Sequence, residues 1–203
     1  MVIIRYQKKK FLLITFIIMI YDKGKAEKVI AQTKKWIDDV VVGCNFCPFA
    51  AREVKGNSIH YQVDGAVLLS DCLQSFRKEC KRLDEQPAIE TTLLIFPDAF
   101  PRFADYLDLL AGAERSLKKN GYEGIYQVAS FHPLYQFSQT AMDDAANYTN
   151  RSLYPMLHLL REERVTAALS HYPHPEQIPI RNIDFARAKS ETYMKMLREA
   201  CFK

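Results

Sequence analysis

Long hydrophobic runs, glycine-rich linkers and internal repeats are absent from this sequence. Its most apolar stretch, Phe11 to Tyr21, has eleven residues, whereas a helix that spans a membrane needs roughly 20. Only seven of the 203 residues are glycine, and no low-complexity segment separates one part of the chain from another. We therefore expect neither a membrane span nor a flexible linker between domains.

Basic residues are not gathered on a face with interleaved aromatic side chains either. The formal net charge is +4, and much of this excess comes from Arg5 and from Lys8 to Lys10 at the start of the chain. A nucleic-acid-binding protein concentrates such charge along one surface. We therefore expect no nucleic-acid partner.

The cysteines lack the pattern of a small disulfide-linked scaffold. Their number is five, and an odd count without compact spacing favours free thiols in a reducing compartment. We therefore expect a cytoplasmic protein. The five are Cys44, Cys47, Cys72, Cys80 and Cys201.

The first residues imitate a signal peptide, because Lys8 to Lys10 precede the apolar run Phe11 to Tyr21. No small-residue cleavage site follows, and Met19 offers another start just before the first helical pattern. We predict that residues 1–18 are an extension or a mis-assigned start. Residues 19–203 should form one α/β domain, since hydrophobic residues make up 48% of the chain and are sufficient for a core.

Hydrophobic periodicity predicts helices and strands in the order α-β-α-β-α-β-α-α. Predicted helices cover Glu27 to Val42, Leu69 to Leu83, Phe103 to Leu117, Ser152 to Leu169, and the segment that begins at Pro179. Predicted strands cover Ser58 to Val63, Thr91 to Phe96, and Ile125 to Phe131. The Thr91 to Phe96 run is apolar on both faces, so we expect it at the centre of the sheet, flanked by the other two strands. This order predicts an α/β fold with a small, largely parallel or mixed sheet of three or more strands packed with helices.

The segment from His132 to Arg151 shows neither helical nor strand periodicity. A stretch of about 20 residues without regular structure inside a compact domain is usually functional or contains a missed element. It brings together several polar side chains, and we treat it as the first place to look for a site. These side chains are His132, Gln136, Asn147, Asn150 and Arg151.

Several strings in one order resemble the bacterial family known as domain of unknown function DUF1415. They are Gly43 to Ala50 (GCNFCPFA), Glu90 to Leu94 (ETTLL), Gln127 to Pro133 (QVASFHP), Asn147 to Ser152 (NYTNRS), Tyr154 to Glu162 (YPMLHLLRE) and Arg181 to Ile183 (RNI). The resemblance covers roughly residues 27–190 and implies no activity, because none is assigned to the family. The family pattern has an aliphatic residue where Cys44 stands and a proline where Leu153 stands, so a mechanism that needs both Cys44 and Cys47 would not be general.

Cys47 and His132 form a candidate nucleophile and base, because an imidazole that takes the thiol proton activates a cysteine. Asn147, Asp143 or Asp144 could orient the ring. The alternative is structural: His132-Pro133 ends a strand, and its imidazole bonds to the backbone.

Cys44-x-x-Cys47 also invites a thiol-redox interpretation, in which a thiolate is stabilised at a helix N-terminus. The string Phe46 to Ala50 is similar to the active-site turn of omega-class glutathione transferases. Against this, the motif follows a helix rather than a strand, and we favour the structural interpretation of a small buried thiol before a helix-initiating proline.

Metal ligation is a further alternative, through Cys47, His132 and His158, or through the pairs Cys44/Cys47 and His171/His174. Zinc sites show compact ligand pairs with characteristic spacing, whereas His171-x-x-His174 lies among prolines. His158, between two leucines, is typical of a core histidine. We predict no metal site.

Two arginines stand at the start of predicted helices, in Asn150-Arg151-Ser152 and in Pro179-Ile180-Arg181-Asn182. Free N–H groups at a helix N-terminus attract anions, and a guanidinium adds a bidentate clamp. The alternative is ordinary capping, with ion pairs to Glu162, Glu163 or Asp184.

Two classes of function follow. The first is a small enzyme that acts on an anionic metabolite, with Cys47 and His132 reactive and Arg151 and Arg181 holding the anion. The second is a non-catalytic binding or regulatory module that uses the same pocket; a low thiol pKa at Cys47 would favour the first, and an inert buried thiol the second. The sequence indicates no particular cofactor or oligomeric state.

We predict that Cys47, His132, Asn150 and Arg151 line one pocket. Further candidate binding residues are Asn45, Gln136, Asn147, His158, Arg181 and Asn182.

Overall fold

The computed structural model describes residues 23–203, so the predicted extension at residues 1–18 lies outside the described residues. Residues 23–36 are α-helical, and the helix continues as a π-helical turn over Ile37–Val42. The strands are β1 (Ile59–Val63), β2 (Thr91–Ile95), β3 (Tyr126–Phe131) and β4 (Met156–Arg161). The further helices are α2 (Ala50–Gly56), α3 (Leu69–Glu85), α4 (Phe103–Lys119), α5 (Glu162–Ser170), α6 (Ile178–Lys189) and α7 (Glu191–Glu199). Short 3₁₀ turns cover Ala145–Thr149, Pro175–Gln177 and Ala200–Phe202.

The four strands form one mixed sheet in the order β1-β2-β4-β3. β1 and β2 are parallel, whereas β4 runs antiparallel to both β2 and β3. The fold is therefore α/β with a small mixed sheet, as the sequence predicts. Both Leu93 and Leu94 in β2 are buried, which agrees with a strand covered on both faces.

Two details of the prediction are wrong. Ser152 does not open a helix, because Met156 to Arg161 form the strand β4 and the helix begins only at Glu162. The run Met156 to Leu160 is continuously apolar apart from His158, and periodicity cannot distinguish such a run from a helix. As a result β2 is flanked by β1 and β4, and the predicted neighbour β3 lies on the far side of β4.

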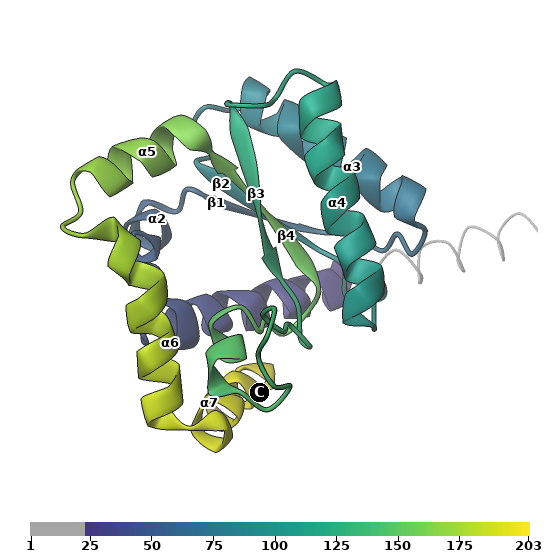
Figure 1. The fold of residues 1–203 in the computed structure, drawn as a ribbon. Helices are drawn as coiled ribbons and strands as arrows, with labels where there is room; N and C mark the ends of the chain where they lie inside the picture. Colours follow the sequence, from purple (N-terminus) through teal and green to yellow (C-terminus); the bar gives the residue numbers. More distant parts are fainter. Residues whose placement is uncertain (1–22) are drawn as a thin grey trace, which may run out of the picture.

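Each face of the sheet is covered by its own set of helices (Figure 1). α3 and α4 cover one face, where Leu94, Leu157 and Leu159 belong to the core. The helix of residues 23–42 crosses the other face, together with α6, α7 and the Ala145–Thr149 turn, over Leu93 and Ile95. Within the described residues no helix is long and apolar enough to cross a membrane.

Candidate functional site

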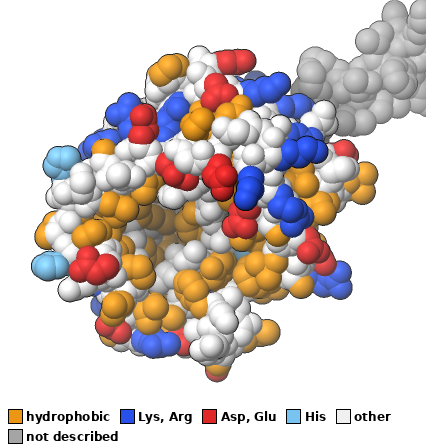
Figure 2. All heavy atoms as spheres, turned by 45° about the horizontal axis from the view of Figure 1, so that its top comes forward, with side chains coloured by type: hydrophobic (Ala, Val, Ile, Leu, Met, Phe, Trp, Pro, Cys, Tyr) orange, Lys and Arg blue, Asp and Glu red, His pale blue; other side chains and the backbone are white. Residues whose placement is uncertain are grey.

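A cavity of about 420 Å³ lies on the second face of the sheet, and we call it the sheet pocket. Figure 2 shows it as a hollow lined mostly by hydrophobic side chains, with charged side chains along part of the rim. Alternate residues of all four strands form the floor: Ile59, Thr91, Leu93, His158, Leu160, Gln127, Ala129 and Phe131. The walls come from three segments: the first helix (Trp36, Ile37, Val41), the turn before α2 and α2 itself (Cys47, Pro48, Phe49, Ala50, Arg52, Glu53), and α5 (Arg164, Val165, Ala168).

The strand register explains why these residues share one floor. Thr91 pairs with Ile59 on β1 and with Leu160 on β4, and Leu160 pairs with Gln127 on β3. Side chains of directly paired residues point to the same face. The row therefore crosses the whole sheet, and the next row on the same face contains Leu93 and His158.

His158 is the titratable group of the floor. Its Nε2 lies 2.7 Å from the Thr91 hydroxyl oxygen, and that hydroxyl donates its proton to the carbonyl oxygen of Leu159. The imidazole must therefore donate from Nε2, because the hydroxyl has no second proton to give. Burial lowers the pKa of His158 to about 4, so the ring is neutral at neutral pH.

Cys47 supplies a thiol to the pocket wall. The backbone N–H groups of Phe49 and Ala50 favour its thiolate form, but burial outweighs them and raises the pKa of the thiol above its ordinary value. Cys44 belongs to the same turn without appearing in the pocket lining, and burial also raises its pKa. At neutral pH Cys47 is therefore a thiol, which is the weakly nucleophilic form.

Paired charges stand at the mouth of the pocket. Arg164 on α5 lies 3.2 Å from Glu90, which precedes β2, and Arg52 lies 2.9 Å from Glu53 within α2. Arg161 also touches the pocket, but its guanidinium donates to backbone carbonyls at the end of α3 and before β2. Two of the three arginines in the lining are thus paired with a glutamate, and the third, Arg161, is held by backbone carbonyls.

Trp36 forms part of the wall and is only 1% exposed. Its indole Nε1 is buried and has no hydrogen-bond partner among the described residues. The ring packs edge-on against Phe131 at 5.3 Å between centroids, and Phe131 lies 6.0 Å from the His158 ring. Trp36 and His158 are therefore separated by a single aromatic side chain.

His132 lies elsewhere and has a structural environment. It is 1% exposed, its Nε2 lies 2.8 Å from the Phe100 carbonyl oxygen, and its Nδ1 accepts a 2.9 Å hydrogen bond from the Leu134 N–H. Burial lowers its pKa. Both ring nitrogens are occupied by backbone groups, so neither is free to take a proton from Cys47.

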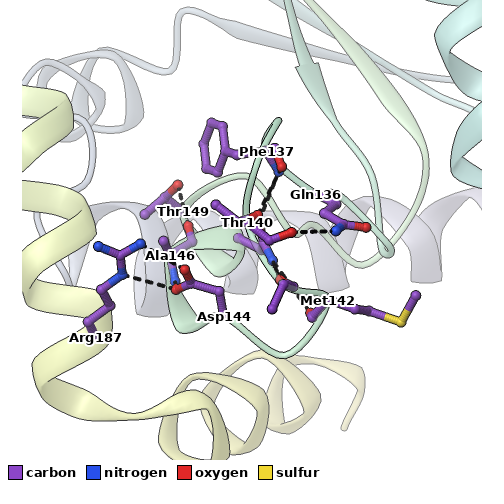
Figure 3. Close-up of polar contacts among 10 residues, drawn as sticks. Gln136, Phe137, Thr140, Met142, Asp144, Ala146, Thr149 and Arg187 are labelled. Carbon is purple, nitrogen blue, oxygen red and sulfur yellow. Dashed lines mark hydrogen bonds and ion pairs between the residues drawn. The ribbon is translucent and has the colours of Figure 1, made fainter.

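The polar side chains after His132 hold their own loop together (Figure 3). Asn147 is fully buried, accepts from the Phe137 N–H and the Thr140 hydroxyl, both at 2.9 Å, and donates to the Ala141 carbonyl at 2.8 Å. Gln136 donates to the Thr140 carbonyl at 2.6 Å. Asp144 forms a 2.8 Å ion pair with Arg187 on α6. The network accounts for the polar residues of this segment without a ligand.

Arg151 and Asn150 belong to the same structural network. Arg151 is 7% exposed and donates to the carbonyls of Tyr135 at 2.9 Å and Met142 at 2.7 Å. Asn150 donates to the Ser130 carbonyl at 3.2 Å. Arg151 does not stand at a helix N-terminus, because the element that follows is the strand β4.

Arg181 and Asn182 lie in the first turns of α6, where the sequence predicts a helix. Arg181 donates to the Asn45 carbonyl and to the Tyr172 hydroxyl at 3.1 Å. Asn182 donates to the Phe46 carbonyl at 2.7 Å. Both side chains therefore fasten the turn that carries Cys47.

Of the candidate residues, the structure brings Cys47 and His158 into the sheet pocket. His132, Asn150 and Arg151 do not appear in its lining, so this pocket does not unite the predicted group. Within residues 23–203, no three His, Cys, Asp or Glu side chains gather closely enough to hold a metal ion. Sequence reasoning missed most of the lining, including five polar or aromatic contributors, although the alternation of β3 could have pointed to two of them. The five are Trp36, Thr91, Gln127, Phe131 and Arg164.

A family model described as "Protein of unknown function (DUF1415)" matches residues 28–196. The resemblance seen in the sequence strings is thereby confirmed. Neither the search of curated proteins nor the search of solved structures found a match.

Proposed function

The chain belongs to the DUF1415 family, whose description assigns no activity, and we propose that it binds a small, largely apolar molecule in the sheet pocket. The observation that carries the proposal is the floor of the pocket, where side chains from all four strands line about 420 Å³ of space. Ligand sites are typically concave, mostly apolar and of about 300–1,000 Å³, with a few polar groups.

The protonation states in the pocket support binding rather than acid–base catalysis. Cys47 is held as a thiol and His158 as a neutral imidazole, since burial disfavours the charged form of each. A catalytic pair would instead have pKa values close to neutral pH. A non-catalytic binding module is therefore the better supported of the two classes.

The charges favour a neutral ligand over the anionic metabolite expected from the sequence. Arg151 and Arg181 both donate to backbone carbonyls. Of the arginines that line the pocket, Arg52 and Arg164 are each paired with a glutamate, and Arg161 donates to backbone carbonyls. An anion would have to compete with those carboxylates. A neutral molecule buries its apolar surface without disturbing either pair.

Titration with naphthalene, a neutral apolar probe, tests the proposal. Trp36 is the only tryptophan, so its indole N–H signal in NMR reports on the pocket wall without assignment of other residues. We expect a saturable shift of that signal. Ala168→Phe fills the pocket from α5 and should weaken binding at least about tenfold, which corresponds to 1.4 kcal/mol.

Ala104→Phe is the matched control, because Ala104 is exposed on α4, which covers the opposite face of the sheet. It should bind naphthalene like the wild type. A titration without saturation, or equal binding by Ala168→Phe and Ala104→Phe, would contradict the proposal.

Thiol chemistry at Cys47 is the second candidate function. The observation that favours it is the position of the thiol in the pocket wall, close to the Phe49 and Ala50 N–H groups, which lower the pKa of the thiol against the effect of burial. The pH dependence of Cys47 alkylation separates this candidate from simple binding.

A further inference from the structure

The hydrogen bonds around His158 fix which of its nitrogens can meet a ligand. The Thr91 hydroxyl has one proton, and it is donated to the Leu159 carbonyl. Its contact with His158 Nε2 at 2.7 Å is therefore donated by the ring. A neutral imidazole that carries its proton on Nε2 leaves Nδ1 as an acceptor with a free lone pair.

None of the described residues donates a hydrogen bond to that Nδ1. The strand neighbours of His158 are Leu93 and Ala129, and neither side chain has a donor. Phe131 supplies only an aromatic ring at 6.0 Å. An acceptor without a partner in such surroundings is unfavourable, and a donor brought by a ligand would satisfy it.

The wall beside it contains a second unsatisfied polar group. The Trp36 side chain is 1% exposed, and its N–H is a buried donor without a partner among residues 23–203. Phe131 packs against both rings, with centroids 5.3 Å from Trp36 and 6.0 Å from His158. A hydroxyl group both donates and accepts.

We propose that the ligand of the sheet pocket is a neutral apolar molecule with a hydroxyl group that donates to Nδ1 of His158. The inference rests on the proposed function and specifies the chemistry of the same site. A carboxylate or phosphate oxygen would face the lone pair of Nδ1 without a proton to offer. A hydroxyl group carries the proton that Nδ1 lacks.

Three probes with the same naphthalene ring system test the inference: naphthalene, 2-naphthol and 2-methoxynaphthalene. All three are neutral and apolar, but only 2-naphthol can donate. We expect wild-type protein to bind 2-naphthol about five- to tenfold more tightly than 2-methoxynaphthalene, the effect of one net hydrogen bond. In His158→Phe the ratio should fall to about one.

His174→Asn is the matched control, because His174 is an exposed histidine in a left-handed conformation that asparagine tolerates. It should keep the wild-type preference. A second measurement needs no substitution: the ¹⁵N signals of His158 should report a neutral ring protonated on Nε2, and 2-naphthol should shift the Nδ1 signal while 2-methoxynaphthalene does not.

The outcomes separate this inference from the proposed function. If none of the three compounds binds, the proposed function fails. If all three bind equally to wild-type protein, the pocket binds apolar molecules and the hydroxyl inference is wrong. A preference for 2-naphthol that persists in His158→Phe, or an unchanged Nδ1 signal, also overturns the inference. Preference in the wild type and its loss in His158→Phe support it.

Discussion

Asn182 donates a 2.7 Å hydrogen bond to the carbonyl oxygen of Phe46, a residue 136 positions earlier in the chain. Its neighbour Arg181 donates to the Asn45 carbonyl. Two consecutive side chains at the start of α6 thus hold two consecutive carbonyls just before Cys47. The position of the pocket thiol therefore depends on α6, although α6 supplies no residue to the pocket lining.

Replacing Asn182 with alanine should loosen this turn. We expect the free energy of unfolding to fall by about 1 kcal/mol, because one buried carbonyl loses its donor, and iodoacetamide to alkylate Cys47 several-fold faster. Asn120→Ala is the control, since Asn120 also donates to a carbonyl, that of Ser116 at the end of α4. It should lower stability without changing the alkylation rate; equal rates in the two variants would show that Asn182 does not fix the thiol.

Alkylation of Cys47 should increase with pH beyond the range of an ordinary thiol. Burial raises its pKa, so the thiolate fraction at neutral pH is small. Mass spectrometry in a Cys44→Ser background follows Cys47 alone, and saturating naphthalene should slow its modification. A rate that levels off below pH 8 would instead support a reactive thiol and the second candidate function.

Arg151→Ala should damage the fold and leave pocket binding intact. The guanidinium serves two carbonyls in a 7% exposed environment, and the loss of both bonds should cost about 3 kcal/mol. Urea denaturation measures this loss, and naphthalene titration of the folded fraction should give the wild-type affinity. Arg102→Ala removes an exposed arginine from its pair with Asp105 and should change stability by less than about 1 kcal/mol. Weaker naphthalene binding by folded Arg151→Ala would instead show that Arg151 contributes to ligand binding.

The protein should lose stability as the pH falls from about 6.5 to about 4. Burial lowers the pKa of His158 to about 4 in the folded state, while the unfolded chain keeps an ordinary value near 6.5. Between these values the unfolded state binds the extra proton, so acid favours unfolding, by about 3 kcal/mol in total from this residue. His60 and His132 are shifted in the same direction.

Urea denaturation at a series of pH values isolates the contribution of His158. His158→Phe should flatten the profile between pH 6.5 and 4 relative to wild type, with the remaining slope due to His60 and His132. His174→Asn should retain the wild-type profile. Parallel profiles for wild type and His158→Phe would mean that His158 titrates normally.

Local sequence patterns were sufficient to predict the strands β1, β2 and β3. Alternation or a β-branched apolar run distinguishes each of them, and turn residues bound them. β4 was missed because Met156 to Leu160 has no diagnostic period and because Ser152 and Pro155 imitate the start of a helix. Tertiary pairing with β2 and β3 decided the conformation of this segment, and that pairing is not encoded locally.

The site was harder to predict for the same reason. Cys47 and His158 line one pocket only because β4 inserts between β2 and β3, which no local pattern reveals. The polar residues of the loop from His132 to Arg151 suggest a ligand site. A buried loop, however, needs such side chains to satisfy its own backbone N–H and C=O groups. Arg151 and Asn147 satisfy backbone groups of the loop, and residue type alone cannot distinguish this structural role from ligand binding.

The place of β4 also bears on how the nascent chain matures. β4 is the last strand to be synthesised, yet it occupies an inner position in the sheet. Until Arg161 has left the ribosome, β2 has a partner on one edge only and β3 has none. An unpaired edge can associate with other chains. Chaperones would therefore bind this domain late in its synthesis. At that stage the β1–β2 pair has formed, and the sheet still lacks the strand that joins β2 to β3.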